Sequence, residues 1–163
     1  DGRGNRVYRK EGERYEVNPL GMVYSGENFY LVCFHDKYEN PASYRIDKME
    51  DVRVEESKIT RKKQFENFDL NEYKNETFGM YYGEKTDVTL NFPPELLDVV
   101  RDRFGAVEPK SNGDGYIVNA TVRVSRTFFA WITTFEGKVK ILEPETVKER
   151  YKAFIEKIYQ SLD

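Results

Sequence analysis

Residues 28–49 read NFYLVCFHDKYENPASYRIDKM, and this stretch decides what kind of fold the first third of the chain can adopt. A nearly continuous apolar run comes first, a polar loop follows, and a second, alternating segment closes the stretch. Short runs of this kind, bounded by turn-forming residues, predict two strands joined by a loop. In the second strand, alternation predicts that Tyr44 and Ile46 point into a core. Arg45 and Asp47 are then expected to share the opposite face.

The strand pattern continues on both sides of this stretch. Residues 15–17 and 22–24 alternate before it, with Asn18-Pro19 between them, and Val52 and Val54 alternate after it. Several short strands in close succession predict a small, strongly bent β-barrel.

The last half of the chain predicts a regular order of elements. They are a strand at residues 88–92, a helix opened by Pro93-Pro94 and ended at Gly105, a hairpin of residues 106–110 and 116–124 that turns at residues 112–115, a helix capped by Ser125, a strand at residues 139–142, and a helix from Pro144. This β-α-β-β-α-β order with a terminal helix is typical of the ferredoxin-like arrangement. The terminal helix is predicted to bury one apolar stripe, formed by Val147, Tyr151, Phe154, Ile155, Ile158 and Leu162.

The chain is therefore expected to be α+β and to fall into three parts. Residues 1–58 form the barrel, residues 59–85 a connector, and residues 86–163 the ferredoxin-like domain. We expect a helical turn or two in the connector, folded onto the domains because its aromatic side chains need cover. Its basic run, Arg61-Lys62-Lys63, is expected to be a solvated face.

Composition excludes several classes of protein. The net charge is −3, and neither half of the chain is basic, which argues against a protein that coats duplex DNA through bulk charge. Cys33 is the single cysteine, so an intramolecular disulfide and a cysteine-cluster zinc site are excluded, and we interpret Cys33 as a buried apolar residue. No apolar run approaches the ~20 residues of a membrane span, and we expect a cytoplasmic protein.

The sequence shows no constellation that indicates catalysis. A phosphate-binding Gly-rich loop, a metal-ligand cluster and a nucleophile elbow are all missing from the pattern. Neighbouring acids such as Glu55-Glu56 could suggest a general acid/base pair, but we interpret them as solvated surface residues. A small hydrolase or transferase is thus the least favoured class, and we expect neither an enzyme nor a bound cofactor or metal.

Three motifs in order carry a resemblance to a known family. Asn18-Pro19-Leu20, Phe29-Tyr30-Leu31 and residues 44–49 (YRIDKM) are similar to those of the WYL domain of bacterial transcriptional regulators. Residues 141–144 (ILEP), together with Trp131 and the Gly137 turn, resemble the C-terminal extension, WCX, that follows it. Phe29 stands where the family has tryptophan, and Ala42 stands where many members have a further arginine.

The resemblance implies an Sm/SH3-like barrel that senses an effector, a nucleotide or single-stranded nucleic acid, and acts on operator DNA through a separate domain. The winged helix-turn-helix of such regulators is not among these 163 residues, so we expect a fragment of a longer regulator. Such regulators commonly act as homodimers. The alternative is a stand-alone module that binds single-stranded nucleic acid without an operator-binding domain.

Five residues are candidates for ligand binding, and each has a structural alternative. Arg45 can bind a phosphate or carboxylate through two hydrogen bonds, or it pairs with Asp47 on the surface. Tyr30 is expected on the same face and can stack on a base, or it belongs to the core. His35 and Lys37 lie at a strand end, where binding residues gather. Lys48 matches a basic position of the family, or it neutralises a nearby carboxylate.

Overall fold

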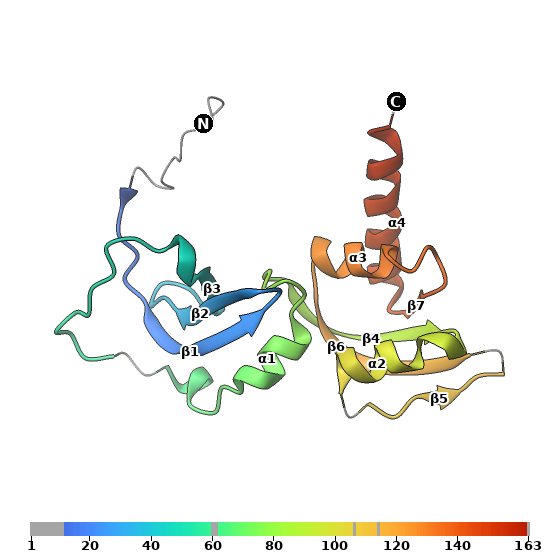
Figure 1. Cartoon of the computed structure of the whole chain (residues 1–163), viewed down its shortest axis with the longest axis horizontal. Helices are drawn as coiled ribbons and strands as arrows, with labels where there is room; N and C mark the ends of the chain where they lie inside the picture. Colours follow the sequence, from blue (N-terminus) through green and yellow to red (C-terminus); the bar gives the residue numbers. More distant parts are fainter. Residues whose placement is uncertain (1–11, 60–61, 106, 114, 163) are drawn as a thin grey trace.

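The computed structural model describes residues 12–59, 62–105, 107–113 and 115–162. Within these residues the strands form two antiparallel sheets. Helix α1 (Leu70–Glu76) lies between the two sheets in Figure 1. The first sheet has the order β1-β2-β3 and the second has the order β5-β6-β4-β7.

The first sheet is built around a tight hairpin. Strands β1 (Asn18–Ser25) and β2 (Asn28–Phe34) are joined by Gly26 and Glu27, which both have positive φ, the conformation that a two-residue hairpin turn requires. β1 runs through Pro19 with a bulge between Pro19 and Gly21. The predicted break at Asn18-Pro19 is therefore wrong, because proline is tolerated at the start of an edge strand.

The described residues do not close a barrel. Strand β3 (Ala42–Arg45) is followed by a 3₁₀ turn (Ile46–Lys48), so the predicted alternation stops at Arg45. Val52 and Val54, predicted to lie in a strand, are instead 72% and 98% exposed outside any strand. The side chains of Val52 and Val54 have no apolar surface to pack against. The sheet cannot close into a barrel, because three strands are too few.

The two faces of the first sheet differ in burial. One face packs with α1 through a cluster of Val23, Val32, Tyr73 and Met80. The other face exposes Met22, Tyr24 and Phe29. Tyr44 lies opposite Leu31 and so shares the exposed face, not the packed one. The predicted orientation of β3 is therefore reversed.

The connector is folded onto the first sheet, as predicted. Asp69 caps α1 by accepting hydrogen bonds from the backbone of Asn71 and Glu72 at 2.7 and 3.1 Å. Leu70 lies directly over β1, where a Cβ at Gly21 would collide with it. A chain of ring contacts joins Phe34 to the connector residues Phe65, Phe68 and Tyr73. These connector rings are covered, whereas Tyr81 and Tyr82 are 47% and 55% exposed.

The second sheet has the predicted order of elements. They are β4 (Glu84–Phe92), α2 (Leu97–Phe104) after a 3₁₀ turn at Pro94–Leu96, β5 (Lys110–Ser111), β6 (Tyr116–Val124), α3 (Arg126–Thr133), β7 (Lys140–Glu143) and α4 (Glu145–Gln160). Ser125 Oγ caps α3 by accepting from the Phe128 amide at 3.2 Å. The hairpin partner β5 is shorter than predicted, and its expected first residue, Ala106, lies outside the described residues.

The main hydrophobic core lies between this sheet and its helices. Leu90, Val118, Val122, Phe128 and Ile132 are fully buried, and each such side chain stabilises the fold by about 1.5–3 kcal/mol. α4 joins this core only through its first half. Ile155, Ile158 and Leu162, predicted to be buried, are 36%, 42% and 78% exposed, because the helix extends beyond the second sheet (Figure 1).

Candidate functional site

Arg45 and Tyr30 are direct cross-strand neighbours. Tyr30 of β2 pairs with Arg45 of β3 in the antiparallel register, so the two side chains emerge on the same face of the sheet. Tyr30 is half-buried and packs against the cluster beneath α1. The structure therefore gives Tyr30 a packing role and places Arg45 at the margin of the same face.

Arg45 forms a fork-shaped ion pair with Asp47. Its Nε and Nη2 donate to the two Asp47 carboxylate oxygens at 3.0 and 2.8 Å. Asp47 belongs to the 3₁₀ turn after β3, and the ion pair given above as the structural alternative for Arg45 is present. The Arg45 hydrogen bond holds the pKa of Asp47 below its ordinary value of 3.8 and raises that of Arg45.

The ion pair does not use the whole guanidinium. Arginine has five N–H donors, and the two bonds to Asp47 leave the Nη1 edge for a second acceptor. The Arg45 and Asp47 side chains are 33% and 56% exposed, so a solute can reach them. An exposed pair of this kind contributes little to stability.

His35 lies within a group of aromatic rings. Its Nε2 is 2.7 Å from the Tyr44 hydroxyl oxygen, and the rings of Tyr15 and Tyr38 contact its edge. The hydrogen bond to Tyr44 and these ring contacts give His35 a structural role directly after β2. Lys37 lies nearby in the exposed loop that follows.

The five predicted ligand-binding residues fall into two groups. Tyr30, Arg45 and the exposed Lys48 lie at one end of β2 and β3, since Lys48 belongs to the turn that follows Arg45. His35 and Lys37 lie beyond the other end. Five residues of extended strand separate Tyr30 from His35, which is about 16 Å. The two groups therefore lie at opposite ends of the strands.

The loop after β2 is held in place by the connector. Lys62 Nζ donates to the backbone oxygens of His35, Asp36 and Tyr38 at 3.1, 2.7 and 2.9 Å, and Gln64 Nε2 donates to that of Glu39 at 2.7 Å. The prediction that the basic run is a solvated face is therefore wrong for Lys62. Arg61, in the same run, lies outside the described residues.

A surface hollow of about 390 Å³ is bordered by the loop after β2, the connector and the second sheet. It is lined by Glu39, Asn40, Pro41, Gln64, Phe65, Asn67, Phe68, Asp69, Glu72, Tyr73, Glu76, Lys85 and Arg123. The lining is polar and contains charges of both signs. The net charge that the hollow presents to a solute therefore depends on which of these side chains pair with each other.

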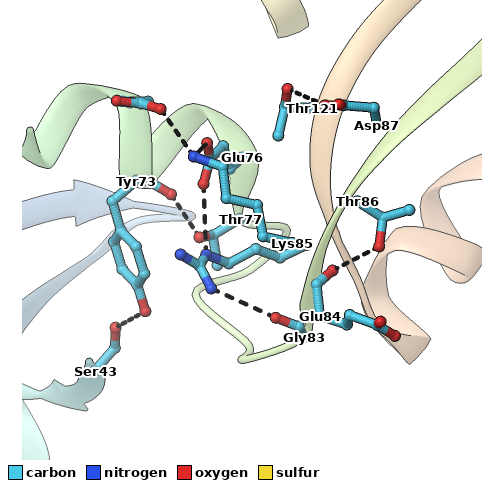
Figure 2. Close-up of polar contacts among 12 residues, drawn as sticks. Ser43, Tyr73, Glu76, Thr77, Gly83, Glu84, Lys85, Thr86, Asp87 and Thr121 are labelled. Atoms are coloured by element: carbon cyan, nitrogen blue, oxygen red, sulfur yellow. Dashed lines mark hydrogen bonds and ion pairs between the residues drawn. The ribbon is translucent and has the colours of Figure 1, made fainter. Parts of the chain in front are cut away.

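A charge cluster of Glu76, Lys85 and Arg123 lies in this hollow. It is here called the buried charge cluster because Glu76 and Arg123 are buried, although the Lys85 side chain is 48% exposed. Lys85 Nζ is 2.5 Å from Glu76 Oε1 and 2.9 Å from Glu72 Oε1. Arg123 Nε is 3.6 Å from Glu76 Oε2. The Glu76 side chain is 6% exposed and that of Arg123 is 11% exposed. Figure 2 shows Lys85 extending from β4 towards Glu76 on α1.

The pKa values of this region follow from these pairs. Glu76 and then Glu72 raise the pKa of Lys85 above its ordinary value. Lys85 in turn lowers the pKa of Glu72. Both pKa shifts favour the charged forms of Lys85 and Glu72.

Tyr73 connects the first sheet to the buried charge cluster. Its hydroxyl oxygen is 3.2 Å from Ser43 Oγ on β3 (Figure 2), and its ring lies 5.0 Å from the Arg123 guanidinium carbon. Ser43 is two residues before Arg45 on the same strand. One helix, α1, therefore contacts both the strand that carries Arg45 and the second sheet.

Sequence reasoning missed the buried charge cluster. Lys85 and Arg123 are cross-strand partners in β4 and β6, while Glu76 belongs to the connector. The available signal was the three-residue spacing of Tyr73 and Glu76, which places both on one side of α1. Cys33, in contrast, is fully buried as predicted, and burial raises its thiol pKa to about 11.

Among the described residues, no group of three or more His, Cys, Asp or Glu side chains could hold a metal ion. No helix in the same part of the chain is long and apolar enough to cross a membrane.

Comparison with known proteins adds a family assignment. A WYL domain model matches residues 5–54 and a WCX domain model matches residues 84–159. Among solved structures, the chain is similar to proteasome accessory factor B/C (PafBC) of Arthrobacter aurescens at 18% identity and a TM-score of 0.39, over 86% of this chain and 21% of that one. The chain thus spans about a fifth of the length of PafBC. A search of curated proteins finds no match. The two domain matches show that the chain belongs to the WYL-domain proteins and carries a WCX domain behind its WYL domain.

Proposed function

We propose that this chain is the effector-sensing and dimerising region of a bacterial transcription regulator. The observation that carries the proposal is the succession of a WYL domain and a WCX domain in one chain. The regulator acts in the cytoplasm and engages operator DNA through a separate winged-helix domain. Its role is regulatory and not enzymatic.

The effector is an anion, a nucleotide or single-stranded nucleic acid, bound by Arg45. Three features of Arg45 support this assignment. Asp47 holds the guanidinium in a fixed orientation, the Nη1 edge is not used by that pair, and the side chain is partly exposed. A pre-oriented guanidinium binds phosphate with less loss of side-chain entropy than a mobile one. Lys48, in the turn after Arg45, adds positive charge nearby.

Binding at Arg45 is transmitted through β3 and α1. Ser43 and Tyr73 connect β3 with α1, and Glu76 connects α1 with Lys85 and Arg123 of the second sheet. A ligand that favours one position of β3 therefore also favours one arrangement of the WYL and WCX domains, which is a population shift. The DNA-binding domain responds to that arrangement.

A second candidate function is a stand-alone module for single-stranded nucleic acid. Its support is the exposed face of the first sheet, where the rings of Tyr24 and Phe29 lie 4.9 Å apart and are 54% and 58% exposed. Exposed rings of this kind stack on bases with little regard to sequence. The two candidates use opposite faces of the same sheet.

Thermal-shift titration with ribonucleotides and single-stranded DNA oligonucleotides tests both candidates. Arg45→Ala is expected to abolish the ligand-induced rise in melting temperature while leaving the melting temperature of the free protein unchanged. Arg53→Ala is the matched control, since Arg53 pairs with an aspartate two residues away in the same exposed manner. Loss of the shift only in Phe29→Ala supports the second candidate, and equal loss in both arginine variants contradicts the role of Arg45.

A further inference from the structure

The chain passes from one hydrophobic core to the other within three residues. Phe78 is 5% exposed and belongs to the main core, where its ring lies 5.1 Å from that of Phe128 and 5.1 Å from that of Trp131. Met80 is 6% exposed and belongs to the cluster that packs the first sheet against α1. The relative position of the two cores therefore depends on the backbone of residues 78–80, here called the crossover.

The chain on both sides of Met80 is fixed to the second sheet and its helices. Before Met80, Thr127 Oγ1 of α3 donates to the Phe78 backbone oxygen at 2.6 Å. The Arg103 guanidinium of α2 lies 3.8 Å from the centre of the Phe78 ring. After Met80, Gly83 lies so close to β6 that a Cβ there would be 2.4 Å from a backbone oxygen of that strand. Met80 therefore enters the first-sheet cluster from a loop whose two ends are held by the other domain.

The backbone of the crossover forms a turn that suits glycine better than methionine. The Tyr81 amide donates to the Phe78 backbone oxygen at 3.3 Å, and the two central residues, Gly79 and Met80, have φ values of 60° and 58°. Positive φ at both central positions is typical of a type I′ turn, in which Gly, Asn and Asp predominate. For an apolar L-residue this conformation is unfavourable, and it persists only where the surrounding structure holds it. Burial of the Met80 side chain provides that hold.

The cluster that contains Met80 also contacts the candidate ligand site. Tyr30 packs against this cluster, and Tyr30 is the cross-strand neighbour of Arg45. Because packed interiors contain few voids, a shift of β2 or β3 changes the space that is left for the Met80 side chain. Side-chain packing therefore connects Met80 with Arg45 without the ion pairs of the buried charge cluster.

We propose that Met80 is a positioning residue that fixes the WYL domain relative to the WCX domain, and that Gly79-Met80 is the joint at which this arrangement changes. In the held state, the Met80 side chain fills the cluster and keeps the positive φ. In the released state, the side chain leaves the cluster, Met80 returns to negative φ, and the two domains take a range of relative orientations. A regulator's use of this joint rests on the proposed function, whereas the joint itself is a property of the ligand-free chain.

Amide residual dipolar couplings of the ligand-free 163-residue chain test the proposal. In the unmodified chain, the couplings of the two sheets are expected to fit one alignment tensor, because the domains are held in one orientation. Met80→Ala removes the side chain that fills the cluster, and the two sheets are then expected to require different tensors. Met80→Leu keeps the apolar volume and is expected to restore the common tensor. A residue that only contributed to stability would lower the melting temperature without separating the tensors.

Gly79→Ala tests the joint without removing a contact. The nearest atoms to the added Cβ belong to the side chains of Tyr81 and Thr127, at 3.7 and 3.8 Å, which is ordinary packing distance. Alanine nevertheless disfavours the positive φ. We expect this variant to lose the common tensor, as Met80→Ala does, while circular dichroism verifies that it keeps its fold.

Gly26→Ala is the matched control. Gly26 and Glu27 form a turn of the same kind between β1 and β2, with φ values of 52° and 63°, and nothing lies within 4 Å of a Cβ added at Gly26. The substitution has a similar backbone cost within one domain, so the common tensor is expected to remain.

Several results would overturn the proposal. They are different tensors in the unmodified chain, a common tensor in Met80→Ala or Gly79→Ala, equal separation of the tensors in Gly26→Ala, and a Met80→Leu variant no better than Met80→Ala. If Met80→Ala does not fold, the comparison of Gly79→Ala with Gly26→Ala decides. Since the couplings are measured without ligand, a missing thermal shift at Arg45 would contradict the proposed function and leave the expectation for the joint unaltered.

Discussion

Two ion-paired groups in this molecule have similar chemistry and opposite surroundings. Arg45 and Asp47 form an exposed pair within one turn of the WYL domain. Glu76, Lys85 and Arg123 form the buried charge cluster between α1 and the second sheet, in which Glu76 and Arg123 are buried and Lys85 reaches them from the surface. The first group joins residues two apart in sequence, whereas the second joins residues from three elements. Burial, and not the kind of residue, separates their roles.

The exposed pair remains available to a ligand because water already solvates it. Forming or breaking it changes the free energy of unfolding little, so an anion can compete for the guanidinium. The buried cluster has no such freedom, since removing one partner leaves a desolvated charge uncompensated. We therefore expect the exposed pair to sense ligand and the buried cluster to hold the two domains in a defined arrangement.

The largest expected effect is that of Glu76→Ala. It leaves Arg123, with a side chain only 11% exposed, without its carboxylate, and it removes one of two partners of Lys85. We expect the free energy of unfolding to fall by about 3 kcal/mol, measured by urea denaturation. Glu72→Ala is the control, because Glu72 binds the same Lys85 from a position 61% exposed, and its effect should be under about 1 kcal/mol. Equal effects would contradict the distinction by burial.

A smaller effect is expected where β3 meets α1. Tyr73→Phe removes the hydroxyl that lies 3.2 Å from Ser43 Oγ while keeping the buried ring. Loss of one part-buried hydrogen bond should lower the free energy of unfolding by about 1 kcal/mol. Tyr82→Phe, at a ring 55% exposed, provides the control and should have no measurable effect. If Tyr73→Phe behaved like this control, the Ser43–Tyr73 contact would not connect the domains.

The Arg45–Asp47 ion pair should be detectable in solution through its effect on the pKa of Asp47. Arg45 lowers the pKa of Asp47 below 3.8, so the pair's small contribution to stability is present above that pH and is lost as the pH falls through the folded-state value. Carbon-detected NMR titration of the Asp47 carboxyl should show its pKa rising in Arg45→Gln. An Asp47 pKa unaffected by Arg45→Gln would mean that the pair does not persist in solution.

The smallest expected effect is that of Arg45→Ala on the free protein. Because both side chains of the pair are exposed, the melting temperature should match that of the unmodified chain within experimental error. A clear fall, measured by differential scanning calorimetry, would move this pair into the same class as the buried cluster.

Local signals made the WCX half predictable from sequence. Val118 and Val122 alternate with polar residues along β6, Ser125 has the side chain of a helix cap, and Pro144 directly precedes α4. Each signal depends only on residues close by in the sequence, so it does not require knowledge of contacts with distant parts of the chain.

The WYL half and the site depended on contacts that sequence does not encode locally. Val52 and Val54 alternate like strand residues, yet no neighbouring surface in the described chain covers them. Tyr30 and Arg45 were predicted on one face, and their register agrees. The Arg45–Asp47 pair was one of the two alternatives for Arg45, but alternation predicted a strand where the chain forms a 3₁₀ turn. Glu76 meets Arg123 only because α1 packs beside β6. Tertiary packing therefore determines both the exposure of Val52 and Val54 and the contact of Glu76 with Arg123.

The central claim, that ligand at Arg45 acts on the WCX domain through α1, is tested most directly by hydrogen–deuterium exchange with mass spectrometry. The ligand for this measurement is the nucleotide or oligonucleotide that gives the largest thermal shift. We predict that it slows exchange in β3, in α1 and at the start of β4, and that Arg45→Ala loses all three changes. Protection confined to the first sheet, or unaltered by Arg45→Ala, would contradict the claim.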